Sequence, residues 1–335
     1  MRRRTFLTTE DPAIVPGAVL CRDRSVATDS GNVNLRRGVD LTDALARLPK
    51  DGQPVRLEIV VPENGEVSQP DASARLAAVI AGPGVIAGPP HQGEVTLKAA
   101  HRGVLRVDGR AVSRLNRSPV VMVATSLDGR LVAEGEDVGI VKAPALFVDD
   151  AGVEKLEQRL ASTSTVRVAP FSVQSAGLIA GDRIRPANLK ASAPHMAAAL
   201  QTFGADLTAV EKVADDPDAI GEVYRRLLAD GAGFLLVAGS IVLDPDDPFI
   251  RALRAIDGHL VRRGAPIEPG TMFWVAYAGN VPIFGLASCE MYGRLSILNL
   301  LLPYAMAREP INRGLMADLG YGGLLQSSFC ARQPD

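Results

Sequence analysis

The chain has 335 residues, of which 36 are basic and 38 acidic, with 47% apolar and only 4% aromatic residues. This length is enough for two domains, each with its own core. The near-neutral charge gives no electrostatic support for DNA or RNA binding. No unbroken apolar run reaches the roughly 20 residues that a membrane helix needs. The composition is typical of a soluble α/β protein.

The N-terminal stretch MRRRTFLTTED begins with arginines but continues with polar residues. An export signal would need an apolar segment of about 7–15 residues at this point. We therefore expect a cytoplasmic protein. The three cysteines have no CxxC spacing and the four histidines are not paired in sequence, which argues against a disulfide framework and against a zinc site.

Residues 1–171 form a turn-rich region that is mixed and mostly β, because short β-type runs alternate with clusters of Gly and Pro. The predicted strands are Val55–Val61, Gly103–Gly109, Val120–Ser126 and Asp137–Val148, and the predicted helices are Leu41–Pro49 and Pro70–Gly82.

In residues 172–309, by contrast, the predicted strands alternate with predicted helices. The predicted strands are Ser175–Gly181, Leu207–Val213, Gly233–Gly239, Met272–Gly279 and Val281–Ser288, and the predicted helices are Ser192–Gly204, Pro217–Gly231, Pro248–Ile256 and Glu290–Ala307. This alternation predicts a three-layer, doubly wound α/β domain with a mostly parallel sheet. A C-terminal tail, residues 310–335, follows it.

Ligands of doubly wound sheets gather at the carboxyl ends of the strands, so the turns there are the candidate sites. After the strand that ends near Ala180, Arg183, Arg185 and Lys190 precede the helix expected near Ser192. These cations and the free N–H groups of the helix terminus could bind a phosphate. A solvated loop is the alternative.

The next such turn follows the apolar run ending at Ala238. Gly239 and Ser240 permit close approach of a ligand, and the acids Asp244, Asp246 and Asp247 follow. Helix capping, worth about 1 kcal/mol, would explain one acid of the last pair without any ligand. Three acids could instead hold Mg²⁺ through one or two carboxylates together with a ligand phosphate.

Two further turns lie closer to the C-terminus. One is the stretch GLASCEMYG, residues 285–293, which places small residues such as Ser288 before a predicted helix. Cys289 is better explained as a packed small residue than as a nucleophile, because no histidine is near in sequence. The other is the Pro269-Gly270 turn.

Taken together, these turns resemble the molybdopterin-binding domain shared by molybdopterin adenylyltransferases and molybdopterin molybdenumtransferases. That domain has a strand ending in GG-[TS]-S-x-G-x-x-D, a later Pro-Gly turn, and a G-L-P-G-x-P turn before the last helix. The counterparts here are Ala238-Gly239-Ser240 with Asp246 or Asp247, then Pro269-Gly270, then Gly285 to Cys289. The resemblance covers about residues 172–308. Residues 62–148 are similar to the N-terminal region of bacterial proteins in which this domain is fused to a nucleotidyltransferase.

The resemblance implies a role in molybdenum-cofactor metabolism and a ligand that is molybdopterin or its adenylylated or metal-loaded form, together with Mg²⁺. It also implies self-association, and it suggests molybdoenzymes or other cofactor-biosynthesis proteins as partners. In an enzyme of this kind Asp246 and Asp247 would be the catalytic and metal-binding acids. The expected ligand contacts are Arg183, Lys190, Gly239, Ser240, Asp244, Pro269, Gly270, Gly285 and Ser288.

The chain also departs from the family pattern. Ala238 replaces the first glycine of the pair, and the Pro-Gly-x-Pro of the last turn has become Ala287-Ser288-Cys289-Glu290. A Cβ in a close-approach turn occupies space that a ligand would need. Three functions therefore stay open. They are a transferase for adenylyl transfer or molybdate insertion, a non-catalytic carrier, chaperone or ligand sensor, and a nucleotide-dependent oxidoreductase. The last lacks a G-x-G-x-x-G after an early strand.

Overall fold

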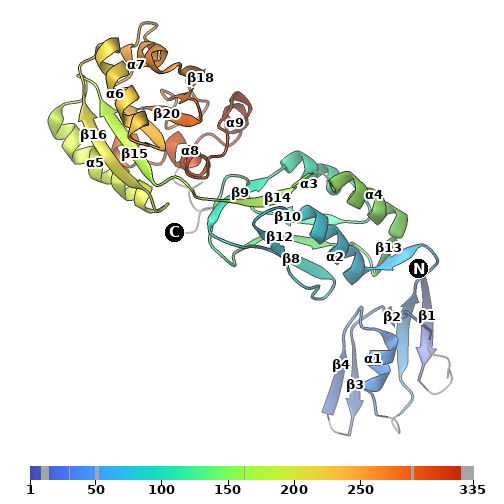
Figure 1. The fold of residues 1–335 in the computed structure, drawn as a ribbon. Coiled ribbons are helices and arrows are strands. Elements are labelled where there is room, and N and C mark those ends of the chain that lie inside the picture. Colours follow the sequence, from blue (N-terminus) through green and yellow to red (C-terminus); the bar gives the residue numbers. More distant parts are fainter. Residues whose placement is uncertain (9–14, 30, 50–52, 162, 288–289, 326–335) are drawn as a thin grey trace. The chain divides into compact units, whose positions relative to one another are not determined.

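The computed structural model describes residues 1–335 except 9–14, 30, 50–52, 162, 288–289 and 326–335 (Figure 1). The chain divides into two compact units, Met1–Val168 and Ala169–Asp335. No helix within the described ranges is long and apolar enough to cross a membrane.

The first unit is built from small antiparallel sheets, which confirms the prediction of a mixed, mainly β region. Its strands are β1 (Arg2–Leu7), β2 (Val19–Leu20), β3 (Arg24–Thr28), β4 (Gly31–Leu35), β5 (Arg56–Val61), β6 (Glu66–Ser68), β7 (Val85–Ala87), β8 (Glu94–Ala99), β9 (Gly103–Val107), β10 (Met122–Thr125), β11 (Leu131–Val132), β12 (Asp137–Lys142), β13 (Phe147–Asp149) and β14 (Val166–Pro170). Its helices are α1 (Leu41–Ala46), α2 (Gln69–Ile80), α3 (Gly109–Leu115) and α4 (Asp150–Leu160). The strand orders are β1-β5-β2, β3-β4, β13-β6, β10-β12-β8-β7 and β11-β9-β14.

Two details of this unit differ from the sequence prediction. The run predicted as one strand, Asp137–Val148, is two strands in two different sheets, β12 and β13. The helices α3 and α4 were not predicted. Each begins at an aspartate, Asp108 or Asp149, whose carboxylate accepts hydrogen bonds from backbone N–H groups of the first turn. This capping is the signal that marks both helix starts.

The second unit contains a six-stranded sheet in the order β16-β15-β17-β20-β19-β18. Its elements are β15 (Ser175–Ala180), α5 (Pro186–Gln201), β16 (Asp206–Lys212), α6 (Pro217–Ala229), β17 (Phe234–Ala238), α7 (Pro248–Ala252), η1 (Leu253–Ile256), β18 (His259–Arg263), β19 (Trp274–Ala278), β20 (Val281–Leu286), η2 (Glu290–Tyr292), α8 (Ile297–Met306) and α9 (Arg313–Asp318). The first four strands in this order run parallel, and β19 is antiparallel to both of its neighbours. The sheet is therefore mixed and mostly parallel, as predicted.

Successive residues of the central strand β17 face opposite sides of the sheet, and both sides are covered. Phe234, Leu236 and Ala238 pack with buried residues of α5 and α8. Leu235 and Val237 pack with α6 and α7 on the other side (Figure 1). A strand buried on both faces needs an unbroken apolar run, and the sequence supplies it. The result is three layers, helix–sheet–helix.

The start of α5 corrects the sequence prediction. A helix was expected from Ser192, but α5 begins at Pro186 and continues through Pro194. Leu189, Met196 and Leu200 are its buried apolar residues, and their spacing of seven and four puts them on one face only if the helix is continuous. Burial of this face outweighs the cost of the internal proline.

The last helix is also shorter than predicted. A single helix was expected from Glu290 to Ala307, whereas the structure has the short η2 and then α8, which begins at Ile297. Gly293 has φ of +67°, a conformation that cannot continue a helix. Ser296 then caps α8, since its hydroxyl accepts from the Leu298 N–H while its own N–H donates to the Asn299 side chain.

Trp274 and Gly285 form a cross-strand pair between β19 and β20. A Cβ added at Gly285 would lie 1.9 Å from the Trp274 indole nitrogen, so only glycine leaves room for this ring. The indole N–H donates a hydrogen bond of 2.7 Å to the Ser240 hydroxyl. Gly285 thus fixes the position of a side chain that reaches the turn after β17.

Gly285→Ala should displace the indole and destabilise the second unit by about 1–3 kcal/mol, the usual cost of overpacking a core. Trp274 is the chain's one tryptophan, so urea unfolding followed by its fluorescence reports on this site directly. Gly109→Ala is the control, because no heavy atom lies within 4 Å of a Cβ added there. Wild-type stability and emission in Gly285→Ala would contradict the packing described.

Candidate functional site

The carboxyl ends of β15 and β17 lie side by side at the point where the chain reverses its direction of travel across the sheet. The chain leaves β15 through α5 toward the edge strand β16, and returns through α6 to β17 on the other side of β15. α5 and α6 pack on opposite faces. Such a switch point leaves a crevice outside the strand ends, where doubly wound sheets bind ligands.

A pocket of about 490 Å³ occupies this crevice. We call it the switch-point pocket. Its lining comes from the turns after three neighbouring parallel strands, namely β15, β17 and β20, with Arg183, Ser240 and Ala287 as representatives. Its volume lies within the range of small-molecule sites. Arg183 is the one charged residue in the described part of this lining.

Large apolar side chains form an exposed rim around the pocket. Met272 and Tyr292 are nearly half exposed, and Leu243 is 74% exposed. Ile184 and Ile241 add further apolar surface. Exposed apolar surface of this extent at a concave site favours contact with a flat, apolar part of a ligand.

The turn after β17 has a backbone conformation that requires glycine. Gly239 has φ of +99°, and a Cβ there would lie 3.3 Å from the Ile184 side chain and 3.5 Å from the Gly181 nitrogen. The Arg183 guanidinium donates to the Gly239 carbonyl at 3.5 Å. Ala238, just before it, is fully buried in the core cluster shared with α5 and α8, and it is not part of the pocket lining.

Asp247 is fully buried and connects the Ser240 turn to α7. One carboxylate oxygen accepts from the Ser240 hydroxyl at 3.0 Å and from the Phe249 and Ile250 N–H groups at 3.1 Å each. The other accepts from the Ile241 N–H at 2.6 Å. Four donors therefore surround this carboxylate. Its charge also adds to the effect of burial, the larger cause, in raising the pKa of the Tyr224 hydroxyl.

Asp244 and Asp246 lie on the same connection as Asp247 but in different surroundings. Asp246 is exposed, and its N–H donates to the Asp244 carboxylate at 2.9 Å. None of the three acids lines the switch-point pocket. Over the described residues, no group of three or more His, Cys, Asp or Glu side chains is arranged to hold a metal ion.

A reciprocal pair of hydrogen bonds holds the turn after β15 to the end of β16. The Asp182 N–H donates to the Asp215 carboxylate at 2.9 Å, and the Asp215 N–H donates to the Asp182 carboxylate at 3.1 Å. Lys212 donates to the Gly181 carbonyl and lies 3.5 Å from the Asp182 carboxylate. The bond from the Asp215 N–H, and then Lys212, lower the pKa of Asp182.

The remaining predicted ligand contacts are spread over the unit. Lys190 lies on α5 in a different groove, against β16. Gly270 is buried, and a Cβ there would lie 3.1 Å from the Ile297 nitrogen, so the Pro269-Gly270 turn packs against the start of α8. Gly285 is covered by Trp274, and Ser288 lies outside the described residues.

The structure thus gathers Arg183, Gly239 and Ser240 at one pocket, as the strand-end rule predicts. Sequence reasoning missed the apolar rim and Asn188, which also line it. The signal for the rim was present, since Ile241 and Leu243 directly follow the glycine turn, where a solvent-exposed loop would normally be polar.

Asp247→Asn should lower the free energy of unfolding by about 1–3 kcal/mol, because an amide cannot accept from donors on both sides and one buried donor loses its partner. Asp246→Asn is the matched control and should leave the melting temperature unchanged. Thermal unfolding of both variants checks this. Equal effects of the two substitutions would mean that the Asp247 carboxylate does not hold the turn.

The lowered pKa of Asp182 predicts an acid-dependent loss of stability. Since the folded-state pKa lies below the usual 3.8, the carboxylate stabilises the fold above pH 3.8, and this contribution is lost as the pH falls from 3.8 through the folded-state pKa. Asp182→Asn should flatten that part of the stability profile, measured by urea unfolding between pH 5 and about 2.5. A profile parallel to the wild type would contradict it.

No protein-family model matches the sequence, and no curated protein matches it. Solved structures do show likeness. The molybdopterin biosynthesis enzyme MoaB of Thermus thermophilus matches 40% of this chain and 91% of its own, at 19% identity and a TM-score of 0.31. The Mog protein of Mycobacterium ulcerans matches 40% and 97%, at 13% identity and 0.30. CinA of Thermoplasma acidophilum, of unknown function, matches 40% and 98%, at 17% identity and 0.32. The likeness is one of fold, over about 40% of the chain.

Proposed function

We propose that this protein binds molybdopterin, or its adenylylated or metal-loaded form, in the switch-point pocket and acts in the biosynthesis or handling of the molybdenum cofactor. The observation that carries the proposal is the pocket itself. It lies at the carboxyl ends of β15, β17 and β20, and it is lined by the same Gly239-Ser240 turn on which the resemblance to molybdopterin-binding domains rests.

The pocket has a cationic group and a separate apolar, aromatic surface, and this combination suits a phosphorylated pterin. Arg183 is a guanidinium, which binds phosphate oxygens through paired N–H donors. Ile184, Met272 and Tyr292 offer apolar and aromatic surface for a flat heterocycle. Gly239 supplies the φ of +99° of this turn and lets it pack closely against Ile184 and Gly181 of the turn after β15.

Ser240 and Asp247 position this surface. The Ser240 hydroxyl already accepts from Trp274 and donates to Asp247, so its role is to hold the turn. The four donors around Asp247 leave it poorly suited to coordinate Mg²⁺. Over the described residues, no three His, Cys, Asp or Glu side chains are grouped to hold a metal ion. Asp244, Asp246 and Asp247 therefore do not fit a Mg²⁺ site, and we assign no step to the ion.

A non-catalytic carrier or sensor is the second candidate. The polar groups of the described lining are those of Arg183, Asn188, Ser240 and Tyr292, and the acids of the Asp244–Asp247 connection lie outside it. These are groups that bind and orient a ligand. Turnover, as adenylyl transfer or molybdate insertion, would depend on Asp246, the exposed acid of that connection.

Calorimetric titration with molybdopterin and with its adenylylated form tests the binding. Arg183→Gln should weaken binding at least tenfold, because a charge-assisted contact to phosphate is worth roughly 1.5–3 kcal/mol. Gly239→Ala should also weaken it, since alanine disfavours φ of +99°. Lys190→Gln, in a different groove, is the control with unchanged affinity.

The same titration separates the alternatives. No heat with either ligand, at protein concentrations suited to micromolar affinity, would rule out the proposal. Equal loss of affinity in Lys190→Gln and Arg183→Gln would place the ligand elsewhere. A third result would favour the carrier over the transferase. In that result the Asp246→Asn variant still binds the ligand, and neither the wild type nor the variant forms product.

A further inference from the structure

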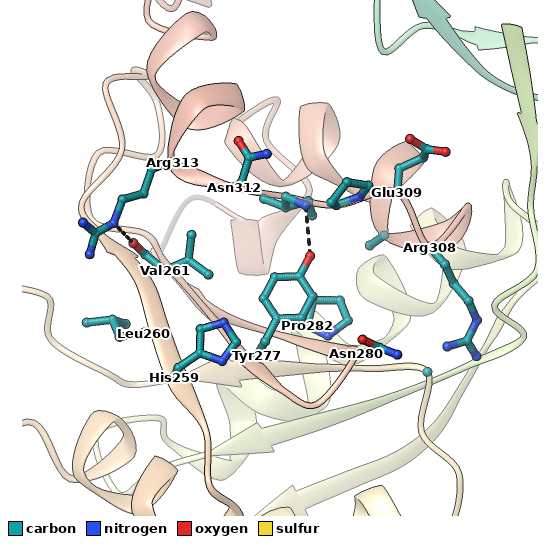
Figure 2. A pocket seen from close by; sticks show the side chains of 14 residues that line it. His259, Leu260, Val261, Tyr277, Asn280, Pro282, Arg308, Glu309, Asn312 and Arg313 are labelled. Carbon is teal, nitrogen blue, oxygen red and sulfur yellow. Dashed lines mark hydrogen bonds between the residues drawn. The ribbon is translucent and has the colours of Figure 1, made fainter. Parts of the chain in front are cut away.

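A second pocket, of about 660 Å³, lies at the opposite end of the same sheet (Figure 2). Its lining includes Gly233 at the start of β17, Pro282 in the first part of β20 and His259 at the start of β18. We call it the amino-end pocket. Gly233 and Gly239 line the two pockets at opposite ends of β17, and six residues of strand span roughly 20 Å. The two pockets are therefore separate.

The wall opposite the sheet is the connection from α8 to α9, and it is fixed at two points. The Ile311 N–H donates to the Tyr277 hydroxyl at 3.0 Å, and the Arg313 Nε–H donates to the Val261 carbonyl at 2.8 Å. Figure 2 shows both bonds, which lie near the α9 end of the connection. They join the wall to β19 and to β18. The cavity is therefore built by tertiary contacts and does not depend on the position of a free loop.

The charged groups of this pocket favour an anion. Arg308 and Arg313 are cationic, and Glu309 is the one acid in the described lining. Within the described chain, neither arginine forms an ion pair. Arg313 donates through Nε to the Val261 carbonyl, and a guanidinium binds carboxylate or phosphate oxygens through paired N–H donors. Asn280 adds a carboxamide.

The floor of the pocket is aromatic. The rings of His259 and Tyr277 are stacked, with centroids 5.8 Å apart and an angle of 15° between their planes. In the view of Figure 2 they lie between the side chains of Arg313 and Arg308. The lining therefore combines aromatic rings with two guanidinium groups, which matches a ligand that has both a flat ring and an acidic group.

We propose that the amino-end pocket is a binding site for a small planar anion, meaning a ring that carries a phosphate or a carboxylate group. This site is independent of the switch-point pocket and of its ligand. The ring would lie against His259 and Tyr277, and the acidic group would pair with Arg308.

Arg308 offers a variant that separates binding from folding. It follows the end of α8 and has φ of +54°, a left-handed conformation that glycine adopts more easily than any other residue at this position. Arg308→Gly should therefore keep or raise the melting temperature while it removes the cation. A loss of binding in this variant cannot be attributed to unfolding.

Titration of the full chain with four probes tests the site. AMP carries a ring and a phosphate, nicotinate a ring and a carboxylate, adenosine a ring without an anion, and ribose 5-phosphate an anion without an aromatic ring. We expect saturable binding of AMP, of nicotinate or of both. We expect adenosine and ribose 5-phosphate to bind at least tenfold more weakly. Arg308→Gly should weaken the bound probe at least tenfold, and Arg183→Gln, at the other pocket, should not.

Each other result overturns the proposal in whole or in part. Saturation by neither AMP nor nicotinate would show that the pocket is not such a site. Binding kept at full strength in Arg308→Gly would overturn the proposed site, and its loss in Arg183→Gln would assign the probe to the switch-point pocket. If ribose 5-phosphate bound as tightly as AMP, the pocket would recognise the anion alone and not an aromatic ring.

Discussion

The geometry of the switch-point pocket depends on one buried carboxylate. Asp247 accepts hydrogen bonds from Ser240 and Ile241 on the turn after β17 and from the first N–H groups of α7. An ionised group is costly to bury, and a set of donors this complete is what makes it stable. The carboxylate thereby fixes both ends of the β17–α7 connection. The turn that lines the pocket is thus held by a residue that does not itself line it.

The same network reaches across the sheet. Ser240 accepts from the Trp274 indole, and that ring fits only because its cross-strand partner is Gly285. Gly239 and Gly285, the two glycines that match the molybdopterin-binding pattern, are thus required for different physical reasons. Gly239 supplies a positive φ in the turn itself, whereas Gly285 supplies space for a ring one strand away. From the sequence pattern alone, both residues would be assigned the same role, that of a ligand contact.

The sequence predicts best where one local signal determines the structure. The apolar run from Gly233 to Gly239 is β17, and Asp216-Pro217 marks the start of α6. Prediction fails where a tertiary contact decides between two acceptable local choices. Ser192 and Pro194 look like a helix start, but the face formed by Leu189 and the residues beyond it keeps α5 continuous. The pocket could be predicted as far as Arg183, Gly239 and Ser240. The apolar residues that form its rim can be seen in the sequence, but their exposure cannot, because exposure depends on how the turns pack. The amino-end pocket could not be predicted, because its lining comes from segments far apart in sequence.

The replacement of the first glycine of the motif by Ala238 has a limited structural effect. Its side chain is fully buried in the cluster that β17 shares with α5 and α8, and it does not line the pocket. The conformational requirement falls on the next residue, Gly239, which the chain retains. A Cβ at residue 238 therefore fills the core, and the loss of that glycine does not by itself close the pocket. The departure that does reach the pocket lies just after β20, where Ala287 stands in the lining.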